Sequence, residues 1–291
     1  MLKLKYLFFT VVILAVQCQL WAREVNGLIK SGNEKLSGVV VTDGIHFVQT
    51  DAGGSFRFEV SDNADFVYIF TPSGYSAPFG SGSPRFYQSL KEASSSFTFN
   101  LEKLPFDTEN YALLATADPQ TQNMEQFARF ERESVSDLQA CISGYNEKKI
   151  NTIGIALGDI AWDELELFAN FKQALAGLKI PFYPVIGNHD HDLNFGDDYA
   201  SAEVYRRQFG PTYYGFNLGK QHYIVLDDIV YKSDEKLERI KEVPGYKIFT
   251  DEAMKVLLAK NIGNRLPGVS AQELSFNPTT VPFRYSVFVY S

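Results

Sequence analysis

Polar residues that could bind a cation or move a proton follow three short apolar segments of this chain. In chain order, these residues are Asp118 and Gln120 after 112–116, Asp159 after 153–157, and Asn188, His189 and Asp190 after 182–186. Ligand sites in open α/β sheets lie outside the carboxyl ends of the strands. Carboxylate and amide oxygens are hard donors that suit divalent cations. We therefore predict a divalent-cation site where three strands end, with His189 in the same cleft.

Histidine is scarce, which narrows the chemistry further. The chain has only four: His46, His189, His191 and His222. Only His189 stands in a motif, Gly-Asn-His-Asp, where a strand end would direct it toward a bound ion. We interpret His46 as a packed or surface residue of a β-domain. For His222, which precedes the strand expected at 223–226, we expect a structural role at an edge rather than metal ligation. For His191 the alternatives are a solvated loop residue or a substrate contact.

The segments that carry the site residues alternate between strand and helix patterns. Strands are expected at 112–116, 153–157, 182–186 and 223–226. Between them, apolar residues recur at helical spacing over 124–145 and 167–178. Strands that alternate with helices indicate βαβ units around a buried parallel sheet. The second part of the chain is therefore predicted to be an α/β domain.

The first part of the chain has a different periodicity. From Val25 to about Leu104, short β-type segments are interrupted by Gly, Asn, Asp and Pro. The clearest strands are at 39–41, 55–60, 66–70 and 96–101. This spacing favours an all-β sandwich. We divide the chain into a signal peptide (1–22), a β-sandwich (23–104) and an α/β domain (105–291).

The amino terminus has the pattern of an export signal. Lys3 and Lys5 precede the apolar run 6–16, which is short for a bilayer span, and Ala22 offers a cleavage point. The alternatives are a lipid anchor on Cys18, which lacks the usual small residue before it, and a retained membrane anchor. We expect a periplasmic or secreted protein with no stable membrane span after cleavage.

Composition excludes several other classes of protein. The formal charge is 27 − 35 = −8 and no long basic run occurs, so a general nucleic-acid-binding patch is not expected. Two cysteines are too few for a Cys-rich zinc module or a disulfide scaffold. A Ser-His-Asp hydrolase is disfavoured because the chain contains no Gly-x-Ser-x-Gly elbow.

The motifs at the strand ends resemble those of the calcineurin-like metallophosphoesterases over residues 111–226, most specifically in Gly187-Asn-His-Asp190. The segments 38–44, 50–56 and 72–75 resemble the carboxypeptidase-regulatory-like, transthyretin-like β-sandwich. This resemblance implies a multidomain fold, with the β-sandwich followed by a domain layered α-β-β-α. It also implies hydrolysis of phosphate mono- or diesters by a metal-bridging hydroxide. The sequence itself carries no prediction of the ester's identity or of an oligomeric state.

The resemblance also implies a role for each site residue. Asp118 and Gln120 would bind the first metal, Asp159 would bridge two metals, and Asn188 would bind the second. His189 would stabilise charge or protonate the leaving oxygen, with Asp163 and Asp190 as candidates to orient it. Two divalent ions are expected, from among Mn, Fe, Mg and Zn. Because Gln120 stands where the family has histidine, the first site is expected to prefer Mn, Fe or Mg over Zn.

The family pattern is incomplete in this chain. The family supplies a further metal-binding histidine after its next core strand and then a Gly-His-x-His segment, but no histidine follows His222. A short helix from Thr250 and a last core strand at 286–290 are expected before the end. We therefore expect a carboxyl-terminal truncation before the last metal-binding motifs, with the second metal site incomplete. The alternative function is a catalytically impaired or inactive envelope binding protein.

Overall fold

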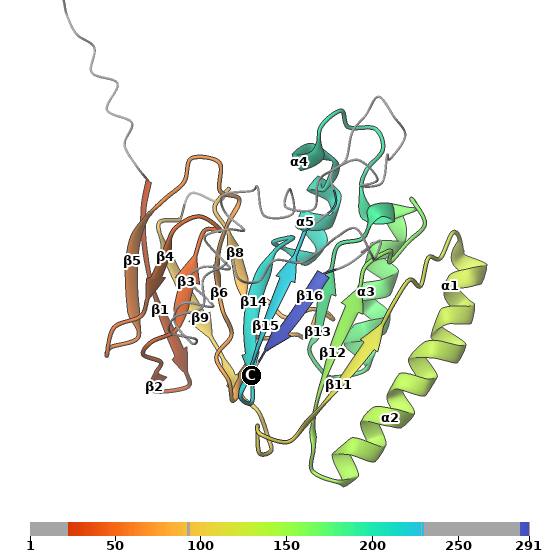
Figure 1. Ribbon diagram of the computed structural model, residues 1–291, viewed down its shortest axis with the longest axis horizontal. Coiled ribbons are helices and arrows are strands. Elements are labelled where there is room, and N and C mark those ends of the chain that lie inside the picture. The colour runs from red at the N-terminus through yellow and green to blue at the C-terminus, as the bar shows by residue number, and fades with distance from the viewer. Residues whose placement is uncertain (1–22, 92–93, 228, 230–285, 291) are drawn as a thin grey trace, which may run out of the picture.

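A computed structural model describes residues 23–91, 94–227, 229 and 286–290. A β-rich domain lies beside a domain that has helices on one side (Figure 1). The segment 1–22 and the helix expected from Thr250 fall outside the described residues. Within the described part of the chain, no helix is long and apolar enough to cross a membrane.

The amino-terminal domain consists of two four-stranded sheets and a short ladder. In the first sheet, β1 (Arg23–Ser31) pairs antiparallel with β2 (Glu34–Lys35) and β5 (Ser55–Val60) and parallel with β9 (Ser96–Asn100). The second has the order β4 (Phe47–Gln49), β3 (Val40–Thr42), β6 (Phe66–Ile69), β8 (Tyr87–Ser89). The ladder joins β7 (Tyr75–Ser76) to β10 (Glu102–Lys103).

Alternation of buried and exposed side chains explains why these segments form strands. In β5 and β9 every second side chain is buried, as a sheet with one face on a core requires. The strand at β1 was not predicted, because polar residues and Gly27 interrupt its apolar pattern. A Cβ on Gly27 would lie 2.1 Å from the Phe97 carbonyl oxygen, so the close pairing of β1 with β9 requires glycine there. The predicted β-rich first domain is confirmed.

The second domain begins with a parallel sheet in the order β11 (Tyr111–Thr116), β12 (Asn151–Leu157), β13 (Phe182–Val185). One continuous helical segment joins β11 to β12, formed by α1 (Met124–Phe130), a π-helical turn (Glu131–Val135) and α2 (Ser136–Glu147). A 3₁₀ turn (Leu165–Leu167) and α3 (Phe168–Gly177) join β12 to β13. The alternation of strands and helices that the sequence predicts is present.

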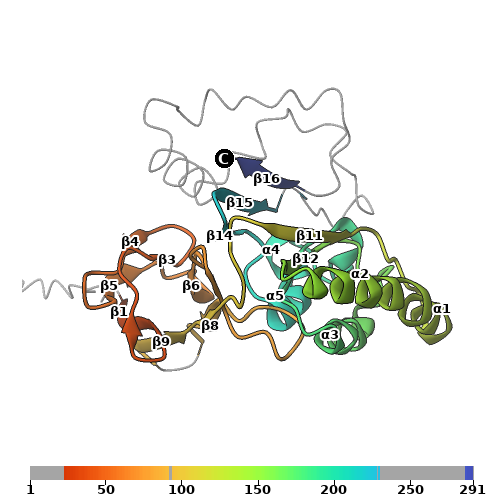
Figure 2. The same ribbon diagram turned by 90° about the horizontal axis from the view of Figure 1, so that it is seen from below.

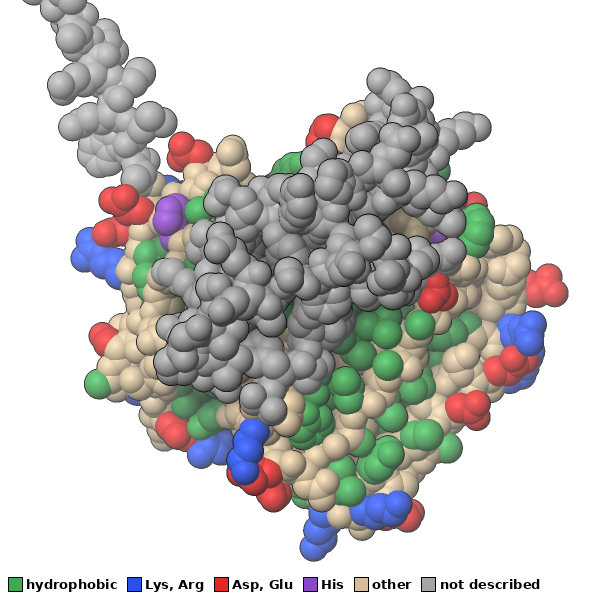
Figure 3. All heavy atoms as spheres, viewed as in Figure 1, with side chains coloured by type: hydrophobic (Ala, Val, Ile, Leu, Met, Phe, Trp, Pro, Cys, Tyr) green, Lys and Arg blue, Asp and Glu red, His purple; other side chains and the backbone are tan. Residues whose placement is uncertain are grey.

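The helices cover one face of this sheet with their apolar sides. Phe127, Phe130 and Ile142 are buried against α3 and the sheet. Met124, which fits the helical spacing in the sequence, is instead exposed at the first turn. On the face seen in Figure 3, hydrophobic side chains gather over β11 and β12.

A second, antiparallel sheet packs on the other face. Its order is β14 (Tyr214–Leu218), β15 (Gln221–Leu226), β16 (Ser286–Tyr290), which confirms the strand expected at 286–290. The Phe216 ring stacks between Tyr183 at 3.9 Å and Tyr223 at 4.7 Å, joining the two sheets. Helices and two sheets thus form three of the four predicted layers, and a second helical layer is not present among the described residues.

The two domains share a hydrophobic core. Phe86 of the β-sandwich lies 4.6 Å from the Tyr214 ring and 6.1 Å from Tyr183, measured between ring centres. The backbone N–H of Asn217 donates to the Thr71 carbonyl at 2.9 Å. The β-sandwich therefore packs directly against the second sheet of the α/β domain (Figure 2).

Candidate metal centre

Three loops meet at the carboxyl ends of β11, β12 and β13. The loop after β11 continues the sheet, since the N–H of Gln120 donates to the Asp159 carbonyl at 3.0 Å and Thr121 forms a bridge with Ala161. The loop after β13 contains a 3₁₀ turn (Asn188–Asp190), in which the N–H of His189 donates to Oδ1 of Asp159 at 3.0 Å. The structure thus brings the predicted residues of all three strand ends together.

The side-chain amide of Gln120 reaches both carboxylates. Its Nε2 lies 2.8 Å from Oδ2 of Asp159 and 3.4 Å from Oδ1 of Asp118. The nitrogen and oxygen of such an amide exchange places when the group turns over. Gln120 can therefore donate between two carboxylates or offer an oxygen to a cation held by them.

Asp159 is held in a tight, fully buried position. Its exposed fraction is 0%, and burying a carboxylate is costly unless it is paired or hydrogen-bonded. A Cβ on Gly187 would lie 2.1 Å from the backbone nitrogen of Asp159 and 2.3 Å from its Oδ1. The β13 loop can therefore approach this carboxylate only because glycine precedes Asn188.

The backbone of the site adopts the left-handed conformation repeatedly. Of the six described non-glycine residues with positive φ, four are predicted site residues: Asp118 (48°), Gln120 (45°), Asp159 (47°) and Asp163 (61°). Such conformations persist where the surrounding structure enforces them, and they cluster at functional sites. Three of the four, Asp118, Gln120 and Asp159, have side chains that meet at the Gln120 amide.

Asp190 has a different environment from the one expected. Its Oδ1 accepts from the N–H of Ile160 at 2.9 Å, and its Oδ2 accepts from the N–H of Gly187 at 2.8 Å. Burial, assisted by the negative charge of Asp159, raises the pKa of the Asp190 carboxyl well above its usual range. The described contacts of this carboxyl therefore fasten the β12 and β13 loops to each other rather than orient the His189 ring.

Asp163, in contrast, contacts the imidazole directly. Oδ1 of Asp163 lies 2.9 Å from Nδ1 of His189. The Trp162 ring stacks on the His189 imidazole, with the two ring centres 4.0 Å apart and the ring planes at 23° to each other. No local spacing in the sequence indicates a role for Trp162, although its position next to Asp163 places an aromatic ring beside a candidate site residue.

Two buried nitrogen atoms at the site have no hydrogen-bond partner within the described residues: Nε2 of His189 and Nδ2 of Asn188. Buried polar groups are almost always satisfied, so unsatisfied ones suggest a missing ion, water or ligand. The donor set of two carboxylates and two amides is rich in oxygen and fits a hard divalent cation. No cluster of three His, Cys, Asp or Glu placed to hold a metal occurs in the described ranges, so this fit depends on the amides.

Each of the other three histidines has a hydrogen-bond partner outside this set of residues. His191 is buried rather than solvated, with Nδ1 2.7 Å from Oγ of Ser201. His222 is buried within β15, the central strand of its sheet, and its Nδ1 lies 2.6 Å from Oδ1 of Asn217. His46 is half-exposed in the β-sandwich, and its Nδ1 lies 3.1 Å from Oδ2 of Asp43.

Comparison with known proteins assigns both parts of the chain. A family model for calcineurin-like phosphoesterase matches residues 111–272, more than half of the 291-residue chain. A second model, for the N-terminal domain of calcineurin-like phosphoesterases, matches residues 23–104. No curated protein and no solved structure matches the chain.

Proposed function

We propose that this chain, which belongs to the calcineurin-like phosphoesterase family, is an exported metal-dependent enzyme that hydrolyses phosphate mono- or diesters. The observation that carries the proposal is the position of His189. Its Nδ1 lies beside Asp163 and its Nε2 has no partner among the described residues, while its backbone is bonded to the Asp159 carboxylate. An acid–base group is therefore fixed next to the oxygen donors.

Asp118, Gln120, Asp159 and Asn188 are the residues that would hold the divalent ion. When bound, such an ion polarises phosphoryl oxygens and lowers the pKa of a water molecule. The donor set favours Mn, Fe or Mg over Zn, because it contains no imidazole or thiolate. The close contact of Gly187 with Asp159 and the left-handed backbone turns would fix the positions of these donors without a bound ion.

The proton transfer is assigned to His189. With Nδ1–H donating to Asp163, the imidazole is fixed in orientation, and a proton on Nε2 can pass to the leaving ester oxygen. The Trp162 ring, which stacks on the imidazole, restricts its rotation. Proton transfer by a positioned side chain contributes about 10²–10⁴-fold to a rate.

Export is proposed from the amino-terminal pattern. Lys3 and Lys5 precede a short apolar run and a cleavage point at Ala22. Mass spectrometry of the protein expressed in a bacterial host with its own amino terminus should find a mature chain that begins near Arg23. A chain that retains Met1, or one that is acylated on Cys18, would contradict cleaved export.

The decisive experiment measures metal binding and turnover separately. Titration of the purified mature chain with Mn²⁺, followed by calorimetry and by the fluorescence of Trp162, the one tryptophan after Ala22, should show binding that Asp159→Asn abolishes. Mn²⁺-dependent hydrolysis of p-nitrophenyl phosphate or its bis ester should be lost in the same variant. Glu166→Gln, at an exposed position of the neighbouring turn, is the matched control and should change neither.

A second candidate function is an inactive binding protein derived from a phosphoesterase. The absence of a three-residue His, Cys, Asp or Glu cluster from the part of the chain that the structure describes favours it. Mn²⁺ binding without turnover of either ester would support this candidate. Absence of both would contradict a metal-dependent function for the chain.

A further inference from the structure

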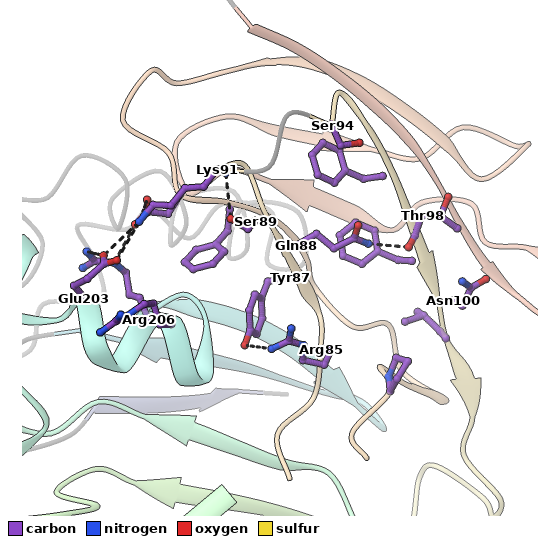
Figure 4. A pocket seen from close by; sticks show the side chains of 17 residues that line it. Arg85, Tyr87, Gln88, Ser89, Lys91, Ser94, Thr98, Asn100, Glu203 and Arg206 are labelled. Carbon is purple, nitrogen blue, oxygen red and sulfur yellow. Dashed lines mark hydrogen bonds and ion pairs between the residues drawn. The ribbon is translucent and has the colours of Figure 1, made fainter. Parts of the chain in front are cut away.

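An open cavity of about 620 Å³ lies between the two domains, and none of the candidate metal-centre residues lines it. One wall is β8, the end strand of its sheet, and a second is β9, which pairs with β1 alone among the described strands. Helix α5 (Glu203–Phe209) forms the third wall (Figure 4). Small-molecule sites typically measure ~300–1,000 Å³ and occur preferentially at domain interfaces.

Positive charge is in excess in this cavity. Its described lining contains four cationic side chains and two acidic ones: Arg85, Lys91, Arg206, Arg207, Asp65 and Glu203. Lys91 lies 3.4 Å from Asp65 and 3.2 Å from Glu203. Arg206 lies 3.0 Å from Asp65 and 3.1 Å from Glu203. The two acids thus compensate these two cations, within a chain whose net charge is −8.

Two guanidinium groups remain. Arg85 and Arg207 have no carboxylate partner within the described ranges. Unpaired guanidinium groups present planar donors that match carboxylate, sulfate or phosphate oxygens. The cavity therefore offers two guanidinium groups whose charge no described carboxylate neutralises.

Contacts with Tyr87 fix the position of the Arg85 side chain. Its Nη1 donates to the Tyr87 hydroxyl at 2.9 Å, and its guanidinium carbon lies 5.0 Å from the centre of the Tyr87 ring. Burial raises the pKa of Tyr87, so no phenolate charge competes with an anion there. Burial, and next the charge of Arg85, lower the pKa of nearby Lys172, which is a second sign of locally positive potential.

The β9 wall offers neutral polar groups. The backbone groups of Ser95 and Leu101 form hydrogen bonds with β1. Because successive residues of a strand direct their backbone groups to opposite edges, those of Thr98 and Asn100 point away from β1. The Thr98 carbonyl on that edge accepts from Gln88 of β8 at 2.7 Å. The Thr98 hydroxyl and the Asn100 amide can both donate and accept, which suits a ligand with several hydroxyl groups.

We propose that this interdomain cavity binds an acidic saccharide of one or two rings, whose anionic group pairs with Arg85 and Arg207 and whose hydroxyls face β9. The shared chemistry is an anion on a hydroxyl-rich body, and the anion can be a carboxylate or a sulfate. The proposal does not depend on phosphoesterase activity, because it uses no residue of the metal centre.

Calorimetric titration of the full chain in EDTA tests this directly, with glucuronate and glucose 6-sulfate as the two acidic probes. At least one should bind one-to-one, and the affinity should fall as salt is raised. Arg85→Gln and Arg207→Gln should each weaken binding by about tenfold or more. Both arginines are exposed, so an unchanged melting temperature will show that the variants fold.

Three controls make the proposal falsifiable. Arg57→Gln removes an exposed arginine of the same β-sandwich outside the cavity and should leave binding unchanged. If neutral glucose binds as tightly as both acidic sugars, the site does not require an anionic group. If inorganic sulfate binds as tightly as glucose 6-sulfate, the site does not recognise the sugar ring. No binding below about 1 mM by either probe, or unchanged binding by both arginine variants, would overturn the site itself.

Discussion

Oδ1 of Asp163 lies 2.9 Å from Nδ1 of His189, although 26 residues separate them in the chain. Asp163 reaches this position through a left-handed backbone turn after β12, with φ of 61°. The contact orients the imidazole and selects the tautomer with the hydrogen on Nδ1, which leaves Nε2 for chemistry. The adjacent Trp162 ring covers one face of the same imidazole.

Asp163→Asn should lower kcat for aryl phosphate hydrolysis by about 10- to 100-fold, because the amide no longer fixes the orientation of the His189 ring. The pH–rate profile of the variant should differ from that of the native chain, because the substitution removes the negative charge beside the imidazole. Glu164→Gln, at the next and exposed position, should leave the profile unchanged. Equal profiles for Asp163→Asn and the native chain would exclude a positioning role for Asp163.

Gly187→Ala should destabilise the fold by about 2 kcal/mol or more and abolish Mn²⁺ binding, because a Cβ would lie 2.1 Å from the Asp159 nitrogen. Chemical denaturation and metal titration measure the two effects. Gly177→Ala is the matched control, since a Cβ there meets nothing within 4 Å. The control should change stability by less than about 1 kcal/mol. Mn²⁺ binding by Gly187→Ala at native affinity would contradict the close approach of the two loops.

Asp65→Asn should weaken the junction of the two domains. Asp65 accepts from Nε of Arg206 at 3.0 Å and from the Tyr199 hydroxyl, and the Asp65 and Arg206 side chains are only 13% and 8% exposed. We expect a loss of about 2 kcal/mol in the free energy of unfolding. Glu24→Gln, which removes the exposed pair with Arg57, should cost less than about 1 kcal/mol. Equal effects of the two variants would show that the interdomain pair contributes no more than a surface one.

The same substitution should loosen the loop that follows the candidate metal centre. Arg206 donates to the Tyr199 carbonyl in α4 (Asp198–Ser201), and Ser201 accepts from the N–H of Asp192 and contacts His191. Hydrogen exchange across 188–192 should therefore accelerate in Asp65→Asn. Unchanged exchange there would confine the role of Asp65 to the junction itself.

Stability should fall as pH decreases from about 6.5 toward 4. Burial, and next the charge of Arg206, lower the pKa of His191 from its ordinary value of 6.5 to about 4. In this window the unfolded chain takes up a proton that the folded chain does not, so acidification favours unfolding, by up to ~3 kcal/mol. Denaturation curves of His191→Asn, each referred to pH 7.5, should show a smaller pH dependence. His46→Asn, at a half-exposed histidine, serves as control, and an equal reduction in both variants would refute the assignment.

Local pattern was enough to establish the class of fold and the family. Alternation at β5 and β9 predicted a β-rich first domain, and the strand–helix alternation after Pro105 predicted the parallel sheet. The Gly-Asn-His-Asp motif indicated the family that the match over 111–272 confirms. These features are readable because each arises from residues that are neighbours in the chain or on one face of an element.

The contacts within the site depend instead on how separate loops pack. The environment of Asp190, the burial of His191 and the stacking of Trp162 on His189 each join residues from different turns, which no local spacing encodes. The strand β1 was not predicted for the same reason. Gly27 interrupts its apolar pattern, and only the close packing of β9 against β1 explains a glycine there. Local sequence patterns thus indicated the two kinds of domain and the candidate polar residues at three strand ends. Tertiary structure alone decided which of those side chains meet, because hydrogen bonding and close packing between distant segments set their final directions.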